Sequence, residues 1–150
     1  MKKILVTGAN GYIAKHIILD LYKKKYSVIG TVRNLEYADI IKNDIETHLG
    51  RPIDIEFVKA DLNSDNGWED AVINSEAILH TASPFPSKRP KNENDLITPA
   101  KEGTIRVLKA ALNHSVKRVI ITSSNAAVYD GNRHITEFDE NIWTNINTKG

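Results

Sequence analysis

Apolar residues along the chain form two alternating kinds of pattern. Short continuous runs rich in β-branched residues end at glycine or polar positions, which is typical of buried strands. Between these runs, apolar residues recur at every third or fourth position, which is typical of a helix with one buried face. The runs predict strands over residues 3–7, 26–32, 53–60, 77–82 and 116–122, and the periodic stretches predict helices over residues 13–22, 35–49, 68–73 and 95–113.

Two of these helices are regular enough to predict the residues that they bury. The first helix should bury Ile13, Ile17 and Leu21, which are spaced four apart, with Ile18 and Tyr22 beside them. The last helix should bury Ile97, Ile105, Leu108, Ala111 and Leu112. From residue 125 onward the pattern fades, and a polar loop is expected.

The alternation of strands and helices predicts a parallel sheet with helices on both faces, because parallel strands need crossover connections. Right-handed crossovers and two βαβ halves then give a doubly wound α/β (Rossmann) sheet of strand order 3-2-1-4-5. A chain of 150 residues has the size of one ordinary domain. Residues 1–150 are therefore expected to form a single domain.

The stretch VTGANGYIA, residues 6–14, follows the first predicted strand and opens the first predicted helix. Glycines there let backbone amides approach a pyrophosphate, and the helix N-terminus adds a positive dipole. The spacing is G-x-x-G-x-x-A rather than G-x-G-x-x-G, so a turn that uses glycine for its geometry alone is the alternative. The predicted dinucleotide-binding residues of this loop are Gly8, Asn10, Gly11, Tyr12 and Ile13.

The end of the second strand bears on the choice of cofactor. An acidic residue there would bind the ribose 2′-hydroxyl of NAD, whereas an arginine accommodates the 2′-phosphate of NADP. The strand ends at Arg33, and no acid occurs before Glu36. A guanidinium can bind a phosphate with two parallel hydrogen bonds. We therefore predict NADP(H) as cofactor; the alternative is that Arg33 is a solvated surface residue.

Composition and charge argue against several classes of function. The 20 basic and 19 acidic residues give a net charge of +1, and hence no electrostatic reason to expect a nucleic acid or a membrane surface as partner. The absence of cysteine excludes disulfides and thiolate catalysis. No stretch reaches the ~20 apolar residues of a membrane span, and no signal peptide is apparent, so a cytoplasmic location is expected.

Histidines give no reason to predict a metal site. His16, His48, His114 and His134 show neither a spacing of four residues nor a cluster with acidic residues, so no metal is expected. His80 lies inside an apolar strand, and we interpret it as a hydrogen-bonded core histidine rather than an acid–base catalyst.

Four segments, in this order, resemble the extended short-chain dehydrogenase/reductase superfamily, also known as the NAD-dependent epimerase/dehydratase superfamily. They are VTGANGYIA, the segment Lys59–Leu62 with sequence KADL, LHTASPF at residues 79–85 and ITSSNAAVYD at residues 121–130. The last two segments together are most similar to yeast NADPH-dependent methylglyoxal and aldehyde reductases and to plant dihydroflavonol reductases. The resemblance covers almost the whole chain.

The resemblance implies further cofactor-binding residues. Asp61 and Leu62 would border the adenine, and Thr81, Ala82 and Ser83 would line the cofactor beyond the fourth strand. A structural alternative is that Asp61 caps the turn that follows it.

The resemblance also implies that Ser124 is the catalytic serine, which would hydrogen-bond the substrate carbonyl. The alternative is that Ser123 and Ser124 are turn residues at a strand end. The family also needs a tyrosine and a lysine spaced Y-x-x-x-K, and the chain has no such pair. The nearest approximation, Tyr129 with Arg133, precedes any helical pattern, and arginine does not readily replace lysine in this role.

These features predict the N-terminal, cofactor-binding part of an NADPH-dependent reductase that transfers hydride to a small aldehyde or ketone. The chain is expected to stop before the sixth strand and the substrate domain, which leaves the fifth strand as an unpaired edge. We therefore expect the isolated chain to be marginally stable or to self-associate through this edge. The alternatives are a non-catalytic NADP-binding module, a decayed gene fragment, and a sugar-nucleotide epimerase or dehydratase. The LHTASPF segment favours the reductase.

Overall fold

The computed structural model describes residues 3–84, 90–129, 131–132 and 134–148. Its strands are β1 (Lys3–Thr7), β2 (Ser27–Val32), β3 (Ile55–Lys59), β4 (Ser75–His80) and β5 (Arg118–Ile121). Its helices are α1 (Tyr12–Lys23), the 3₁₀ turn η1 (Leu35–Tyr37), α2 (Ala38–Leu49), α3 (Trp68–Val72), α4 (Asn94–Asn113) and α5 (Ala126–Tyr129). Phe85, Asp130 and Arg133, which belong to motifs or pairs discussed above, lie outside the described residues.

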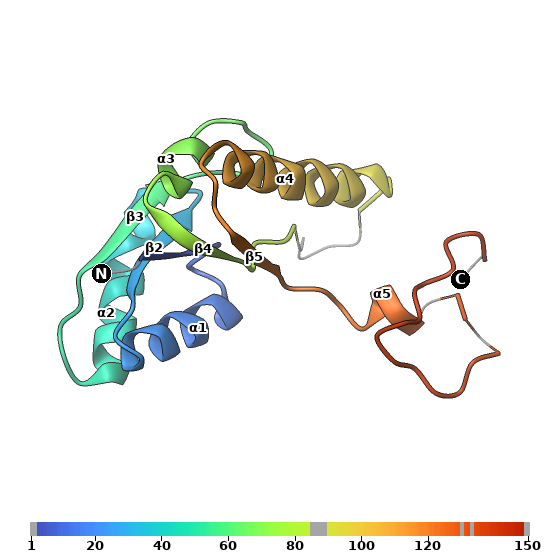
Figure 1. Ribbon diagram of the computed structural model, residues 1–150, viewed down its shortest axis with the longest axis horizontal. Coiled ribbons are helices and arrows are strands. Elements are labelled where there is room, and N and C mark those ends of the chain that lie inside the picture. Colours follow the sequence, from blue (N-terminus) through green and yellow to red (C-terminus); the bar gives the residue numbers. More distant parts are fainter. Residues whose placement is uncertain (1–2, 85–89, 130, 133, 149–150) are drawn as a thin grey trace.

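The five strands form one parallel sheet of order β3-β2-β1-β4-β5, which confirms the predicted doubly wound topology. Figure 1 shows α1 and α2 on one face of this sheet and α3 and α4 on the other. All strands therefore end at the same edge, and the loops that follow β1, β2, β3 and β4 gather there.

The sheet separates two hydrophobic cores. Successive side chains of a strand point to opposite faces, so Leu5 enters the core beneath α3 and α4 while Val6 enters the core beneath α1 and α2. Trp68 and Val107 belong to the first core, and Ile18 belongs to the second. Burial on both faces explains why β1 and β2 are almost continuous apolar runs.

The predicted buried residues of two helices are confirmed in part. In α1, Ile18 and Tyr22 are buried as predicted, Ile17 and Leu21 pack against the same core, and Ala14 is buried with them, whereas Ile13 is 54% exposed. In α4, Ala111 is buried as predicted, together with Gly103, Val107 and Ala110, whereas Ile97, Leu108 and Leu112 are exposed. Small residues occupy the buried face of α4, because they let a helix approach the strands closely. The spacing of large apolar residues therefore predicted both helices and most of the buried face of α1, but not the buried face of α4.

The chain leaves the sheet after β5, as Figure 1 shows, and the short helix α5 was not predicted. The Asn132 amide ties this helix to the segment that follows, because it donates to the carbonyl oxygens of Val128 (3.2 Å) and Trp143 (2.8 Å). A helix of four residues is too short to show a 3.6-residue period. Within the described residues, no helix combines the length and the hydropathy needed to cross a membrane.

Candidate functional site

The loop between β1 and α1 is built for close approach. Gly8 has φ +67°, in the left-handed region that favours glycine, and a Cβ atom on it would lie 3.1 Å from the Cα of Ala82. The Gly8 amide donates to Thr31 Oγ1 (3.1 Å), and the Ala9 amide donates to the Thr31 carbonyl (2.8 Å). The loop is thus fixed to β2 and packed against the end of β4.

Helix α1 begins at this loop without a side-chain cap. Gly11 is its N-cap residue, and its own amide donates to the Gly8 carbonyl (2.8 Å). Because Gly11 has no side chain to bind the first-turn amides, the positive end of the helix dipole faces solvent beside the loop. Asn10, Tyr12 and Ile13 are exposed there, as a pyrophosphate-binding loop requires.

Thr7, the last residue of β1, joins the loop to the end of β4. Its buried hydroxyl accepts hydrogen bonds from the amides of Thr81 (3.1 Å) and Ala82 (3.0 Å). Thr81 returns a hydrogen bond from its own hydroxyl to the Thr7 carbonyl (2.5 Å). The predicted residues Gly8, Thr81 and Ala82 are therefore brought together at one point of the sheet edge. Ser83 follows them and is exposed.

His80 completes this arrangement as a buried acceptor. The two amides occupy the lone pairs of Thr7 Oγ1, so the hydroxyl hydrogen is left to bind His80 Nδ1, 2.8 Å away. The neutral ring then carries its proton on Nε2, which lies 3.4 Å from Thr104 Oγ1 in α4. Burial lowers the pKa of His80 below its usual range. The interpretation of His80 as a hydrogen-bonded core residue is confirmed.

Arg33 follows β2 directly and is exposed at the same edge. The turn η1 begins next to it, capped by Asn34, whose Oδ1 accepts from the Glu36 amide (3.1 Å). The Asn34 amide group also holds the Glu36 carboxylate at 2.6 Å. The exposed guanidinium of Arg33 and the carboxylate of Glu36, which Asn34 holds, are thus only three residues apart in sequence. They follow β2, where the ribose of a bound dinucleotide would be recognised.

Asp61 and Leu62 follow β3 and begin the turn that leads to α3. Asp61 Oδ1 accepts from the Asn63 amide (2.8 Å), so Asp61 does cap its turn, as the structural alternative proposed. This role leaves the rest of the carboxylate available, since an ionised carboxylate can accept about four hydrogen bonds.

Ser124 lies beyond β5, just before α5, and is exposed. Its hydroxyl accepts weakly from the Ala126 amide (3.3 Å) and lies 3.4 Å from Asn125 Oδ1. These local contacts fit a residue that precedes a helix.

Two cavities adjoin these elements without enclosing the predicted site. One of about 300 Å³ lies between α1 and α2 and includes Asn10, Tyr12 and Lys15. Another of about 370 Å³ lies between α3 and α4. Neither is lined by Arg33 or Ala82. The described residues include no cluster of three or more His, Cys, Asp or Glu side chains that could hold a metal ion.

Sequence analysis missed Thr7 and Thr31, although both are polar residues inside otherwise apolar strands. That placement is a usable signal, because a buried hydroxyl must find partners. Both turn out to fix the loop that carries Gly8.

Comparison with known proteins agrees with this geometry. The family model described as "NAD dependent epimerase/dehydratase family" matches residues 4–148. Tetraketide alpha-pyrone reductase 1 of Arabidopsis thaliana is 34% identical over 151 residues, which cover 96% of this chain and 45% of the relative. Anthocyanidin reductase of the same plant is 38% identical over 149 residues, which cover 97% of this chain and 43% of the relative.

A solved structure of yeast methylglyoxal/isovaleraldehyde reductase, complexed with NADPH, superimposes with a TM-score of 0.77 and 31% identity. It is matched over 95% of this chain and 44% of its own length. The chain thus spans less than half the length of these relatives. The resemblance to yeast methylglyoxal reductases is confirmed.

Proposed function

The chain belongs to the NAD-dependent epimerase/dehydratase family, and we propose that it is the cofactor-binding part of an NADPH-dependent carbonyl reductase. The observation that carries this proposal is the glycine loop at the end of β1, where Gly8 lies in the left-handed region against Ala82 and Gly11 leaves the start of α1 uncapped. On this proposal residues 1–150 are an NAD(P)-binding domain, acting in the cytoplasm.

Each residue of the site then has a defined role. The amides that follow Gly8 and Gly11 bind the pyrophosphate, and the side chain of Arg33 binds the 2′-phosphate. Asp61 and Leu62 border the adenine, while Thr81, Ala82 and Ser83 line the rest of the cofactor. NADPH supplies the hydride when bound.

The substrate is proposed to be a small aldehyde or ketone. Support comes from the yeast relative, whose name describes a reductase of methylglyoxal and isovaleraldehyde. Ser124 would donate a hydrogen bond to the substrate carbonyl and orient it toward the cofactor, and its exposed hydroxyl is accessible for this.

A second candidate is a dinucleotide-binding module without chemistry. The observation that favours it is the sequence itself, in which no lysine follows a tyrosine by four residues. A general acid of the Y-x-x-x-K kind is therefore not supplied by these 150 residues. Both candidates predict NADPH binding, and they differ in whether hydride transfer occurs.

The test is to titrate the purified chain with NADPH and with NADH and to measure binding by fluorescence or calorimetry. Arg33→Met should weaken NADPH binding by roughly tenfold or more and leave NADH binding unchanged, because a phosphate contact to a charged donor is lost. Arg118→Met is the matched control, since Arg118 is exposed at the start of β5, at the opposite edge of the sheet.

Two results would overturn the cofactor assignment. One is a chain that binds neither nucleotide, and the other is an Arg33→Met variant that loses NADPH and NADH equally. Oxidation of NADPH by the purified chain in the presence of methylglyoxal would then overturn the binding module. Both candidates are consistent with no oxidation, because these 150 residues supply no general acid of the Y-x-x-x-K kind. The proposed self-association through the β5 edge, where Ile120 and Ile121 are exposed, is measured by sedimentation of the same samples.

A further inference from the structure

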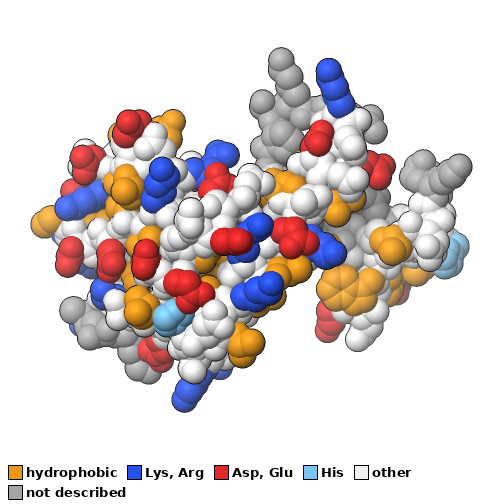
Figure 2. All heavy atoms as spheres, turned by 90° about the horizontal axis from the view of Figure 1, so that it is seen from above, with side chains coloured by type: hydrophobic (Ala, Val, Ile, Leu, Met, Phe, Trp, Pro, Cys, Tyr) orange, Lys and Arg blue, Asp and Glu red, His pale blue; other side chains and the backbone are white. Residues whose placement is uncertain are grey.

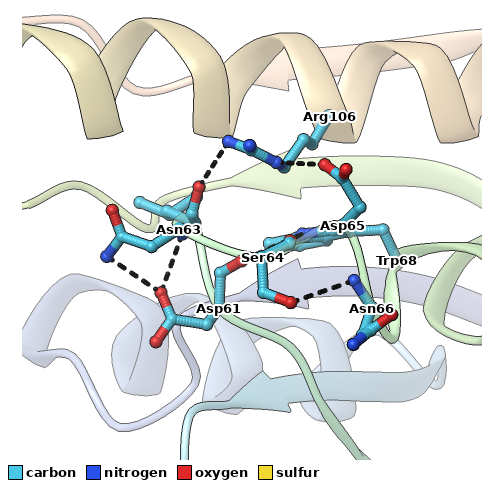
Figure 3. Close-up of polar contacts among 8 residues, drawn as sticks. Asp61, Asn63, Ser64, Asp65, Asn66, Trp68 and Arg106 are labelled. Atoms are coloured by element: carbon cyan, nitrogen blue, oxygen red, sulfur yellow. Dashed lines mark hydrogen bonds and ion pairs between the residues drawn. The ribbon is translucent and has the colours of Figure 1, made fainter.

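The turn between β3 and α3 is held from within by a short network of polar contacts, drawn in Figure 3. Asp61 Oδ1 accepts from the backbone amide of Asn63 (2.8 Å) and from its side chain (3.2 Å). The Ser64 amide donates to the Asp61 carbonyl (3.1 Å). These bonds fix the shape of the turn but not its position on the protein.

Trp68 fixes one side of the turn. Its ring is buried in the core beneath α3 and α4, and its Nε1 donates to the carbonyl oxygens of Asp61 (3.1 Å) and Ser64 (3.0 Å). Both ends of the turn are therefore attached to a side chain that cannot move without disturbing the core.

Arg106, which projects from α4, holds the other side. Its Nη1 donates to the Leu62 carbonyl (2.9 Å), and its Nε forms an ion pair with Asp65 Oδ1. Figure 3 shows the guanidinium reaching from the helix to both partners. Asp65 is largely exposed, and such a pair contributes little by itself, so the partly buried bond to Leu62 is the more important of the two.

Gly103 lies one turn before Arg106 on the same face of α4. A Cβ atom on Gly103 would lie 2.6 Å from Leu62 Cβ, closer than real Cβ contacts allow. Only glycine leaves room for the Leu62 side chain at this point. Gly103 and Arg106 together hold Leu62: Gly103 leaves room for its side chain, and Arg106 binds its carbonyl oxygen.

We propose that Gly103 and Arg106 are positioning residues for the adenosine half of the cofactor. This inference rests on the proposed function, in which Asp61 and Leu62 border the adenine. Neither α4 residue contacts the nucleotide; they hold the turn in its binding position before the cofactor arrives. A turn that must be ordered on binding would lower the affinity, because ordering opposes association.

The experiment compares Arg106→Met with Arg106→Lys and with the control Lys109→Met, which removes an exposed cation one turn further along α4. The ligands are NADPH and adenosine 2′,5′-bisphosphate, the adenosine half alone. Arg106→Met should raise both dissociation constants by roughly tenfold, and by the same factor, since the loss lies in the adenosine half. Arg106→Lys should recover part of the affinity, and Lys109→Met should bind normally.

Amide hydrogen exchange provides the readout that does not depend on the cofactor. In Arg106→Met the amides of Asn63 and Ser64 should exchange faster than in the parent chain, while those of β1 stay protected. Loss of NADPH affinity without loss of bisphosphate affinity would overturn the proposal, as would unchanged exchange and unchanged binding. Should the parent chain bind neither ligand, the proposed function fails, and the exchange rates alone decide whether Arg106 holds the turn.

Discussion

The loop after β1 and the segment after β5 both leave a parallel strand at the same edge of the sheet, but they are held in different ways. Around the first, Thr7 contacts two amides of another strand end and a histidine 73 residues away. Around the second, the described contacts of the Ser124 hydroxyl are with Asn125 and the Ala126 amide, its immediate neighbours. The first region is fixed by contacts between different strand ends of the sheet. The α5 segment beyond β5 is held mainly by contacts with the residues that follow it, such as those of Thr144 with the carbonyl oxygens of Ala126 and Ala127.

On the proposed function, this difference separates the cofactor-binding part of the site from the part that would contact the substrate. Cofactor-binding groups work best when they are ordered before the ligand arrives, since ordering on binding lowers the affinity. The residues around Gly8 meet that condition within this chain. The residues around Ser124 are exposed and do not pack into either core of the sheet. Figure 2 shows a larger and a smaller lobe with a notch between them, and acidic and basic side chains interspersed over the larger lobe.

The largest effect on stability and on NADPH binding is expected from replacing Gly8 in the loop after β1. Gly8 and Gly50 have nearly the same backbone conformation, with φ +67° and +68°, but only Gly8 has neighbours within 4 Å of an added Cβ. Gly50→Ala should lower the free energy of unfolding by ~1–2 kcal/mol, the cost of the left-handed conformation. Gly8→Ala should lower it further and abolish NADPH binding, because the methyl group meets Ala82.

Chemical denaturation and nucleotide titration of the two variants check this prediction. Equal destabilisation of Gly8→Ala and Gly50→Ala, with NADPH binding intact in both, would mean that the contact with Ala82 has no consequence for the loop.

The sequence predicted the sheet well because each strand is a local pattern. The five runs and their alternation with helices were enough to give the strand order, since the crossover rule leaves few arrangements. In α1, Ile18 and Tyr22 are buried as predicted, but Ala14 is buried although small and Ile13 is exposed although large. The contacts of Thr7 with His80 and of Arg106 with Leu62 join residues more than 40 positions apart. No periodic pattern connects such positions, so the family resemblance could suggest Leu62 as a cofactor-binding residue, but the sequence could not predict which helix holds it.

A smaller effect is expected from protonating His80. Burial lowers the pKa of the folded His80 below the usual 6.5, so the unfolded chain binds a proton more readily than the folded one. This contribution to stability is present above pH 6.5 and is lost as the pH falls from 6.5 through the lowered pKa. The free energy of unfolding, measured by denaturation between pH 7.5 and 5, should therefore fall with decreasing pH. In His80→Asn, whose Oδ1 can accept from Thr7 without titrating, the fall should be smaller. His134→Asn, at an exposed position, should keep the full dependence.

The smallest effect on stability is expected at Ser124, and it is informative for that reason. Its hydroxyl accepts from the Ala126 amide (3.3 Å) and donates to Asn125 Oδ1 (3.4 Å), both weakly, at an exposed position before a helix of four residues. Ser124→Ala should change the free energy of unfolding by less than ~0.5 kcal/mol, the range of ordinary surface substitutions, and leave NADPH affinity unchanged. Denaturation and titration measure both quantities. A serine that neither stabilises the fold nor binds the cofactor is free to serve the substrate, whereas a loss of 1 kcal/mol or more would identify it as a structural cap. In that case the loop after β1 and the segment after β5 would differ less than argued above, because residues of both would stabilise the fold.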